Sequence, residues 1–274
     1  MIEFGYETFG KQWVPPSGGA PVIPQPTYDP TAAALFSRFT TEPTTARKDL
    51  INDRIVAGKA STWWAKLDAI WVHAAHAPEA ARLNWLGDFY NCVPVNNPAF
   101  EVDRGYRGNG ATSYLNTQFN PVTAVNANYT QHSASLGVRS NDNNQANGSL
   151  AGYWDGSKGS TINPRDNSNN FPGRVNQSGA KNFGSSPTSI GMFVANRLPS
   201  NTIQGYINGV RKYSDAITPP TAMADGSLRI GAISNTSLRA CQFSMGFVGG
   251  GMTEQELADL FNWFEVYRIA VGVA

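Results

Sequence analysis

Short apolar runs separated by turn residues fill the chain from about residue 85 onward. The runs NCVPV, SASLGVRS, SIGMFVANR and LRIGAIS alternate with stretches of Gly, Asn, Pro and Asp. Strands of antiparallel sheets are about four to eight residues long and are bounded by such turn residues. The pattern therefore predicts a mainly β fold, an antiparallel β-sandwich, over residues 85–274.

The sharpest local signal in this region is Asn208-Gly209, inside the run QGYINGVRKY. A type I′ turn needs positive φ at both central residues, and Asn followed by Gly adopts it readily. The sequence therefore predicts a tight hairpin over residues 203–213.

Helical patterns precede the predicted sandwich, and we assign residues 31–84 to a helical region. Asp29-Pro30 is a good N-cap and first-turn pair, and Thr41 and Pro43 begin a second pattern that ends near Gly58. A third helix is predicted over residues 61–75, STWWAKLDAIWVHAA, because its large apolar residues recur at helical spacing. These residues are Trp64, Leu67, Ile70, Trp71 and Ala74. We expect the stripes to be buried; an exposed tryptophan patch for docking is the alternative.

A C-terminal helix is predicted as the closing element of the sandwich domain. Thr253 and Glu256 have the spacing of a capping box. The apolar stripe then continues through Leu257, Leu260, Phe261, Phe264 and Ile269.

The first 30 residues have a different character. Four aromatic residues, Phe4, Tyr6, Phe9 and Trp13, lie in or beside a stretch rich in Pro and Gly. Proline lacks the amide donor that a helix or sheet interior requires. We predict an extended arm over residues 1–30 whose aromatic side chains dock to another molecule; a disordered terminus is the alternative.

Charge and composition narrow the classes of partner. The 274 residues contain 21 Lys and Arg against 20 Asp and Glu, so no net field favours nucleic acid or an anionic membrane. No apolar run approaches the roughly 20 residues that span a bilayer, and the first residues do not resemble a signal peptide. Cys92 and Cys241 are predicted as small buried thiols, with a single disulfide left open.

Several stretches resemble a known group of domains. DRGYRGNGATSYLNTQFNP (103–121), GMFVANR, IQGYINGVR and the C-terminal SMGFVGGGMTEQELADLFNWFEVYRIAVG are similar to the concanavalin A-like, laminin-G-type jelly roll of structural proteins from tailed bacteriophages and prophages. The resemblance covers about residues 31–274. It implies a jelly-roll form of the predicted sandwich and a role as a virion component.

Few titratable groups are available for catalysis. His73 and His76 could place two imidazoles on one metal ion, but no Asp, Glu or Cys completes a zinc motif. Glu101 and Asp103 alternate as the acids of some glycosidases do. A third acid is missing, however, and the neighbouring Arg104 lowers a carboxyl pKa, which does not suit a general acid. The sequence therefore predicts no catalytic residue, no metal site and no enzyme activity.

Sugar binding is the remaining chemistry, because aromatic faces pack on sugar C–H groups and Asn, Asp and Arg bind hydroxyls. The candidate glycan-binding residues are Tyr153, Trp154, Asp155, Arg165, Asn167, Asn169 and Asn170. If the strands that flank residues 163–170 pair, both clusters could lie near one end of the sandwich. Turn formation by Asn and Asp, and core packing by Tyr and Trp, are the alternative roles.

No cofactor is expected. Asp142, Asp155 and Asp166 are oxygen donors in predicted loops that calcium would accept, and some laminin-G-like domains bind this ion. Their spacing does not form an EF-hand-like loop.

Together these features predict a non-enzymatic virion protein, such as a tail fibre, a receptor-binding protein or a head decoration, assembled in the bacterial host cytoplasm. The expected partners are other virion proteins, further copies of the chain and host cell-surface polysaccharide. A purely structural decoration protein without a ligand, and a polysaccharide-degrading glycosidase, are the alternatives.

Overall fold

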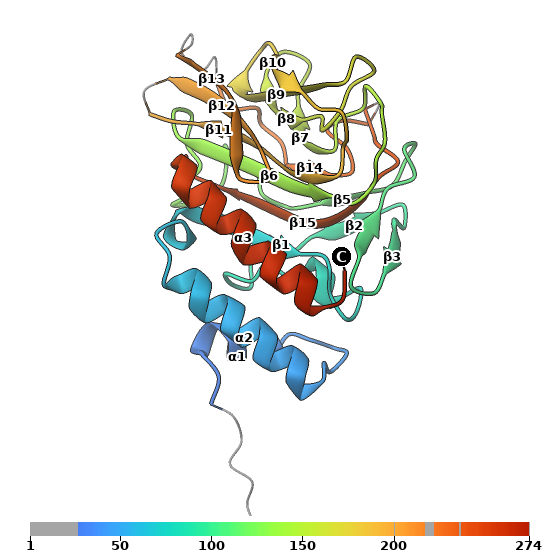
Figure 1. Cartoon of the computed structure of the whole chain (residues 1–274), viewed down its shortest axis with the longest axis vertical. Helices are drawn as coiled ribbons and strands as arrows, with labels where there is room; N and C mark the ends of the chain where they lie inside the picture. Colours follow the sequence, from blue (N-terminus) through green and yellow to red (C-terminus); the bar gives the residue numbers. More distant parts are fainter. Residues whose placement is uncertain (1–26, 200, 217–221, 236, 274) are drawn as a thin grey trace, which may run out of the picture.

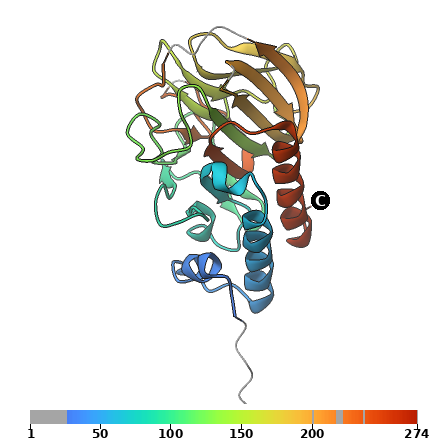
Figure 2. The same ribbon diagram turned by 90° about the vertical axis from the view of Figure 1, so that its left-hand side faces the viewer.

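Three layers make up the protein: two β-sheets packed face to face, and helices on the outer side of one of them (Figures 1 and 2). The computed structural model describes residues 27–199, 201–216, 222–235 and 237–273. The predicted docking residues Phe4, Tyr6, Phe9 and Trp13 lie outside the described residues.

Sheet A is the central layer. Among the described residues it has eight strands, in the order β13–β12–β11–β6–β15–β4–β3, with β1 also paired to β15. The strands are β1 (Leu67–Val72), β3 (Ala99–Glu101), β4 (Gly105–Arg107), β6 (Ala134–Ser140), β11 (Gly191–Arg197), β12 (Thr202–Ile207), β13 (Val210–Ala216) and β15 (Gln242–Gly249). Every pairing in the sheet is antiparallel.

Sheet B covers one face of sheet A. Within the described ranges its seven antiparallel strands follow the order β10–β9–β8–β7–β14–β5–β2. They are β2 (Val93–Val95), β5 (Tyr114–Asn116), β7 (Ala151–Trp154), β8 (Gly159–Ile162), β9 (Asn170–Gln177), β10 (Lys181–Ser185) and β14 (Arg229–Ile230). The predicted mainly β sandwich is confirmed.

Two apolar cores lie on the opposite faces of sheet A. Phe193 and Ala195 of β11 belong to the core between the sheets, whereas Met192 and Val194 belong to the core beneath the helices. Successive side chains of a strand point to opposite faces. A strand with apolar residues at successive positions, such as β11, therefore contributes side chains to both cores. All residues of β1, β6, β11 and β15 are accordingly buried.

The helices on the outer side of sheet A are α3 (Glu254–Ala270), α2 (Thr45–Lys59) and α1 (Pro30–Phe36), which packs on α2. Helices α2 and α3 lie side by side, as Figures 1 and 2 both show. Trp263 joins them, because its Nε1 donates to Arg54 O at 2.6 Å and its ring packs on Trp63 with centroids 5.5 Å apart. No helix in the described part of the chain is long and apolar enough to cross a bilayer.

Several local predictions are confirmed. Asn208 and Gly209, with φ values of 52° and 74°, form the turn between β12 and β13. Asp29 caps α1, and Thr253 with Glu256 forms the capping box of α3.

Two helix details were wrong. Helix α2 is capped by Thr44 instead of beginning at residues 41–43, and Ile269 is 66% exposed instead of continuing the buried stripe of α3. The stripe instead includes Trp263 and Tyr267, because the buried apolar positions of α3 are Leu257, Leu260, Trp263, Phe264 and Tyr267.

The helix predicted over residues 61–75 was also wrong. A 3-10 turn, η1 (Trp64–Lys66), leads directly into strand β1, which pairs with β15 at the centre of the molecule. A strand buried on both faces shows a continuous apolar run, which its periodicity cannot distinguish from a buried helix. A second 3-10 turn, η2 (Ala80–Arg82), follows β1.

Close packing between sheet A and the helices is testable at Gly137 of β6. A Cβ added there would lie 2.0 Å from the ring of Phe247, a buried residue that cannot move into solvent. We expect Gly137→Ala to lower the free energy of unfolding by about 1–3 kcal/mol through overpacking. Gly179→Ala is the control, since a Cβ there meets nothing within 4 Å. Urea unfolding measures both variants, and an equal stability of the two would contradict the packing described.

Candidate ligand-binding site

The predicted glycan-binding residues fall at opposite ends of strand β8. Asp155 lies in the turn that precedes β8, and residues 163–169 form the loop that follows it. Strand β8 pairs with β7 and with β9, as expected, but this pairing separates the two clusters. The expectation that both lie at one end of the sandwich was wrong.

The polar side chains of the 163–170 loop hold the loop together. Arg165 donates from Nε to Asn169 Oδ1 and from Nη1 to Asn143 Oδ1, both at 2.8 Å. Asp166 Oδ1 accepts the backbone N–H groups of Ser168 and Asn170 at 2.8 Å. Asn169 has a φ of 61°, as a turn residue does. The side chains of Arg165 and Asn169 therefore act as turn-forming groups, whereas Asn170 contributes its backbone N–H and Asn167 is exposed.

Arg239 fixes the same loop from below. Its side chain is almost fully buried and donates to Asn163 Oδ1 at 2.6 Å and to the carbonyl groups of Ala146, Gly148 and Arg165 at 2.8–3.0 Å. One guanidinium group thus donates hydrogen bonds to two loops, 141–149 and 163–170, and keeps them together.

Asp155 also has a structural role, as the cap of the β7–β8 turn. Its Oδ1 accepts the N–H groups of Ser157 and Lys158 at 2.8 Å, and Lys158 Nζ lies 3.0 Å from Oδ2. The backbone donors hold the pKa of this carboxyl well below its ordinary value.

Tyr153 and Trp154 belong to a group of rings and guanidinium groups on sheet B. Arg174 of β9 stacks over the Trp154 ring at 4.0 Å. Arg229 of β14 lies 4.8 Å from the Tyr114 centroid and 5.7 Å from the Tyr153 centroid. We call Tyr114, Tyr153, Trp154, Arg174 and Arg229 the arginine–aromatic face. The sequence pointed to two of its five members, because the strand pairing that brings in the other three is not a local property.

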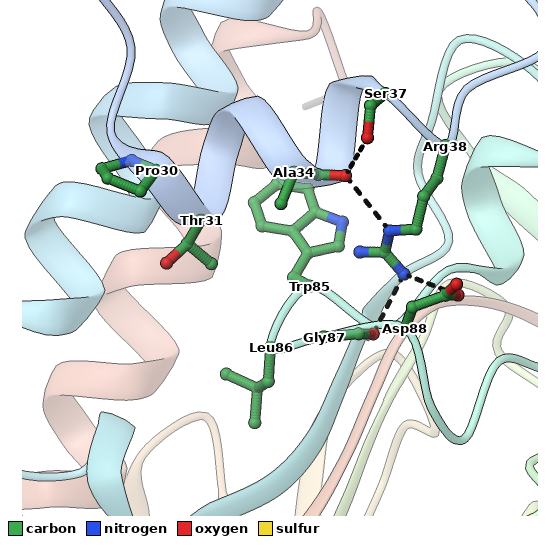
Figure 3. Close-up of a pocket in the computed structure, with 9 residues that line it drawn as sticks. All are labelled: Pro30, Thr31, Ala34, Ser37, Arg38, Trp85, Leu86, Gly87 and Asp88. Carbon is green, nitrogen blue, oxygen red and sulfur yellow. Dashed lines mark hydrogen bonds and ion pairs between the residues drawn. The ribbon is translucent and has the colours of Figure 1, made fainter.

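Two neighbouring clefts lie at the seam between the helices and the sandwich, and both include Thr31 and Leu86 in their walls. The first, of about 480 Å³, is lined by Pro30, Thr31, Ala34, Ser37, Arg38, Trp85, Leu86, Gly87 and Asp88 (Figure 3). Its polar groups are already paired with one another. Arg38, for example, donates to Gly87 O at 2.9 Å and contacts Asp88 Oδ1 at 3.5 Å. The polar groups of this cleft therefore bond to one another, and few of them are available to a ligand.

Residues 84–91, here called the seam loop, separate the two clefts and are held rigidly. Asn84 is fully buried, and its Oδ1 accepts the N–H groups of Ile70 and Leu86, both at 3.1 Å. Its Nδ2 donates to Phe89 O at 3.1 Å. Arg38 adds a bond from Nη2 to Asn84 O at 2.9 Å. A short loop with this many internal bonds has little freedom to collapse.

The second cleft, of about 360 Å³, differs in chemistry, and we call it the aromatic cleft. Phe89 is 49% exposed in its wall, and Trp64 and Tyr90 are half-buried beside it. The remaining lining residues are Thr31, Ala65, Leu67, Asp68, Leu86, Val125, Asn126, Ala127 and Asn128. Concave sites of this size, with aromatic walls and a few polar groups, are typical of small-molecule binding.

Asp68 reaches the aromatic cleft because β1 bulges there. Leu67 pairs with Gly249 and Ala69 with Val248, so Asp68 is the extra residue. Bulges re-aim single side chains and are common beside binding sites. The Asp68 carboxylate accepts the N–H groups of Asn128 and Tyr129 at 2.6 and 2.8 Å, while its burial raises its pKa.

Two residues of the cleft have a positive φ, and one of them is strained by it. Tyr90 and Asn126 both have a φ of 54°, a conformation that Asn adopts with little cost but a bulky Tyr rarely does. The Tyr90 carbonyl is held by Trp71 Nε1 at 2.7 Å. Burial, together with the charge of Asp68, raises the pKa of the Tyr90 phenol. Strain held in place by surrounding contacts is a feature of functional sites.

The histidine and carboxylate side chains that the sequence offered for metal binding or catalysis each bond to another group of the protein. His73 is fully buried with Nδ1 at 2.7 Å from Ala81 O, whereas His76 Nε2 lies 2.8 Å from Thr41 O. Glu101 pairs with Arg104 at 3.0 Å, and Asp103 pairs with Arg47 at 2.7 Å. Within the described residues, no three His, Cys, Asp or Glu side chains group as metal ligands would. Cys92 and Cys241 are buried free thiols.

Comparison with known proteins places the fold among β-sandwich domains. No protein-family model and no curated protein matches the chain. A Trypanosoma rangeli sialidase solved with sialic acid has a TM-score of 0.55 at 13% identity, over 81% of this chain and 39% of the sialidase. The binding domain of botulinum neurotoxin serotype D has a TM-score of 0.52 at 10% identity, over 72% of this chain and 51% of that domain.

A further similar structure is domain 4 of AbnA, an extracellular arabinanase from Geobacillus stearothermophilus in complex with arabinotriose. It has a TM-score of 0.49 at 17% identity, over 71% of this chain and 98% of that domain. The chain spans only about 40% of the length of the sialidases that it matches. At these identities the likeness shows the fold, a β-sandwich.

These comparisons correct the prediction that the chain is not an enzyme. A similar sandwich forms part of a sialidase, a glycoside hydrolase, so the fold gives no ground for excluding enzyme activity. The β-sandwich part of the family resemblance is confirmed, and its bacteriophage part stays a prediction.

Buried His73 makes stability depend on pH. Burial lowers its pKa to about 4, whereas an unfolded histidine has a pKa of about 6.5. Between these values the unfolded chain binds the extra proton, so His73 lowers stability as the pH falls from 6.5 towards 4. We expect the loss of unfolding free energy between pH 7 and pH 4.5 to be about 2 kcal/mol smaller in His73→Gln than in the unmodified protein.

Urea unfolding at the two pH values measures this difference. His132→Gln is the control, because it makes the same substitution at an exposed histidine. An identical pH dependence in His73→Gln and the unmodified protein would contradict the burial of a neutral imidazole.

Proposed function

We propose that this protein is a glycan-binding β-sandwich domain that holds a neutral sugar residue in the aromatic cleft. The observation that carries the proposal is the meeting of aromatic rings and polar side chains in one concave site. Trp64 and Phe89 offer apolar ring surface to sugar C–H groups. Asp68, Asn126 and the Tyr90 hydroxyl offer acceptors and donors to sugar hydroxyls.

The rigidity of the site supports binding. The bonds of Asn84 and Arg38 fix the seam loop before any ligand arrives. The backbone N–H groups of Asn128 and Tyr129 likewise fix the Asp68 carboxylate. Binding therefore requires little further ordering of loops or side chains. A smaller loss of conformational entropy on binding gives a higher affinity.

The comparisons agree with a lectin-like role at the level of fold. A β-sandwich of similar architecture occurs in a sialidase solved with sialic acid and in a neurotoxin binding domain. The comparisons do not identify the sugar, so the chemistry of the cleft carries the assignment of a neutral residue.

The first test is retardation in native gels that contain arabinan, dextran, galactomannan or xylan, followed by calorimetric titration with any polysaccharide that retards the protein. We expect Phe89→Ala to weaken binding at least ten-fold, about 1.4 kcal/mol, because it removes the most exposed ring of the cleft. Tyr90→Phe keeps the ring and removes only the hydroxyl, so it should weaken binding less.

Ile269→Ala is the matched control, because it removes an exposed apolar side chain on α3, which contributes no lining residue to the cleft. Equal binding by Phe89→Ala and Ile269→Ala would place the sugar elsewhere. Failure of all four polysaccharides to retard the unmodified protein would contradict the neutral-sugar assignment.

The proposed setting is a bacteriophage-type virion, in which the domain displays its site to host surface polysaccharide and contacts other virion proteins and further copies of itself. Support for this setting comes from the resemblance of residues 103–121 and of the C-terminal segment to phage structural domains. Mass spectrometry of purified particles tests it. We expect the chain in the particle fraction, and its recovery only from the particle-free lysate would contradict the setting.

A further inference from the structure

Positive charge is concentrated in one part of a nearly neutral chain. Residues 143–241, which include strands β7 to β14, contain nine Lys and Arg against four Asp and Glu. The rest of the chain contains twelve Lys and Arg against sixteen Asp and Glu. This excess of positive charge is shared between sheet B and strands β11 to β13 of sheet A, and the overall charge of +1 does not reveal it.

Arg174 and Arg229 are the members of this region on the arginine–aromatic face. Among the described residues, neither has a carboxylate within ion-pair distance, whereas many other arginines do, such as Arg38, Arg47, Arg107 and Arg139. Arg174 donates to Thr161 Oγ1 at 3.1 Å and to Ser178 O at 3.0 Å, and Arg229 donates to Asn235 Oδ1 at 2.9 Å. Their recorded partners are neutral, so both positive charges stay uncompensated.

The strand register places both arginines on one row across sheet B. Thr161 pairs with Arg174, Gly152 with Thr161, and Gly152 with Arg229. Phe171 and Val175, which flank Arg174 on β9, belong to the core, so Arg174 projects from the opposite face. Three strand steps of about 4.8 Å separate the two row positions by about 14 Å.

Aromatic rings hold the guanidinium planes in place. Arg174 stacks on Trp154, and Arg229 lies 4.8 Å from the Tyr114 centroid and 5.7 Å from the Tyr153 centroid. The rings are themselves fixed by the sheet, and Trp154 N donates to Ile233 O at 3.1 Å. A stacked guanidinium keeps its fork of N–H donors oriented, which suits the planar recognition of a carboxylate or the oxygens of a sulfate.

We propose that the arginine–aromatic face binds the anionic groups, carboxylate or sulfate, of an acidic polysaccharide. One acid group meets Arg174, and another along the same chain meets Arg229, with sugar rings packed on the exposed parts of Trp154 and Tyr114. This site is separate from the aromatic cleft and takes a different class of sugar. Its failure would leave the neutral-sugar proposal unchanged.

The test compares two double variants that remove the same charge. Arg174→Gln/Arg229→Gln changes the face, and Lys181→Gln/Lys212→Gln removes two charges from strands β10 and β13 of the same region. Titrations use alginate for carboxylate, heparin for sulfate, dextran as the neutral polymer and a thymidine oligonucleotide as the nucleic-acid polyanion. Circular dichroism melting confirms that each variant is folded.

We expect the unmodified protein to bind alginate, heparin or both, with affinity that falls as salt rises. The affinity of Arg174→Gln/Arg229→Gln for the acidic polysaccharide should fall at least ten-fold, and that of Lys181→Gln/Lys212→Gln at most about two-fold. Arg174→Lys/Arg229→Lys should bind as weakly as the arginine-to-glutamine variant, because lysine lacks the planar fork of N–H donors that stacks on a ring. Equal losses in the two Gln variants would overturn the site. So would tighter binding of the oligonucleotide than of either acidic polysaccharide, or no binding of either polysaccharide.

Discussion

The burial of sheet A on both faces is the constraint from which the rest of the architecture follows. Strands β1, β11 and β15 carry apolar side chains towards both sides, so neither face can be left in water. Sheet B covers one face and the helices must cover the other. The helices are therefore an integral layer of the fold, and the edge where they meet the sheets becomes a seam with clefts.

The polar groups that fix the seam loop are few, and each makes several hydrogen bonds. Asn84 serves the backbone of β1 and of the seam loop simultaneously, and Arg38 ties the same loop to α1. Buried polar groups favour a single structure when every partner is present. Rigid clefts in the seam follow from this, and the bulge at Asp68 directs a carboxylate into one of them. The sites described here thus depend on long-range packing more than on any motif.

The sequence predicted those features that a few adjacent residues determine. Asn208-Gly209, Asp29-Pro30 and the Thr253–Glu256 pair act through local backbone geometry, and each was confirmed. Residues 61–75 were mistaken for a helix because a strand buried on both faces loses its alternating pattern. That error hid Asp68, and with it the aromatic cleft.

The candidate site was predicted only in part for the same reason. Tyr153 and Trp154 were identified from their chemistry, but their partners Arg174 and Arg229 come from strands whose register no local pattern gives. The Asn-rich loop was an appealing candidate by composition, yet Arg165 and Asn169 bond to each other and to neighbouring turns. Composition alone cannot separate a polar loop that binds a ligand from one that binds itself.

Hydrogen–deuterium exchange with and without a bound neutral polysaccharide tests the central claim most directly. The account predicts slower exchange of backbone amides in residues 84–91 and 125–128, which form the aromatic cleft, and unchanged exchange in residues 141–149 and 163–170. Slower exchange confined to the latter two loops, with none around Phe89, would contradict it.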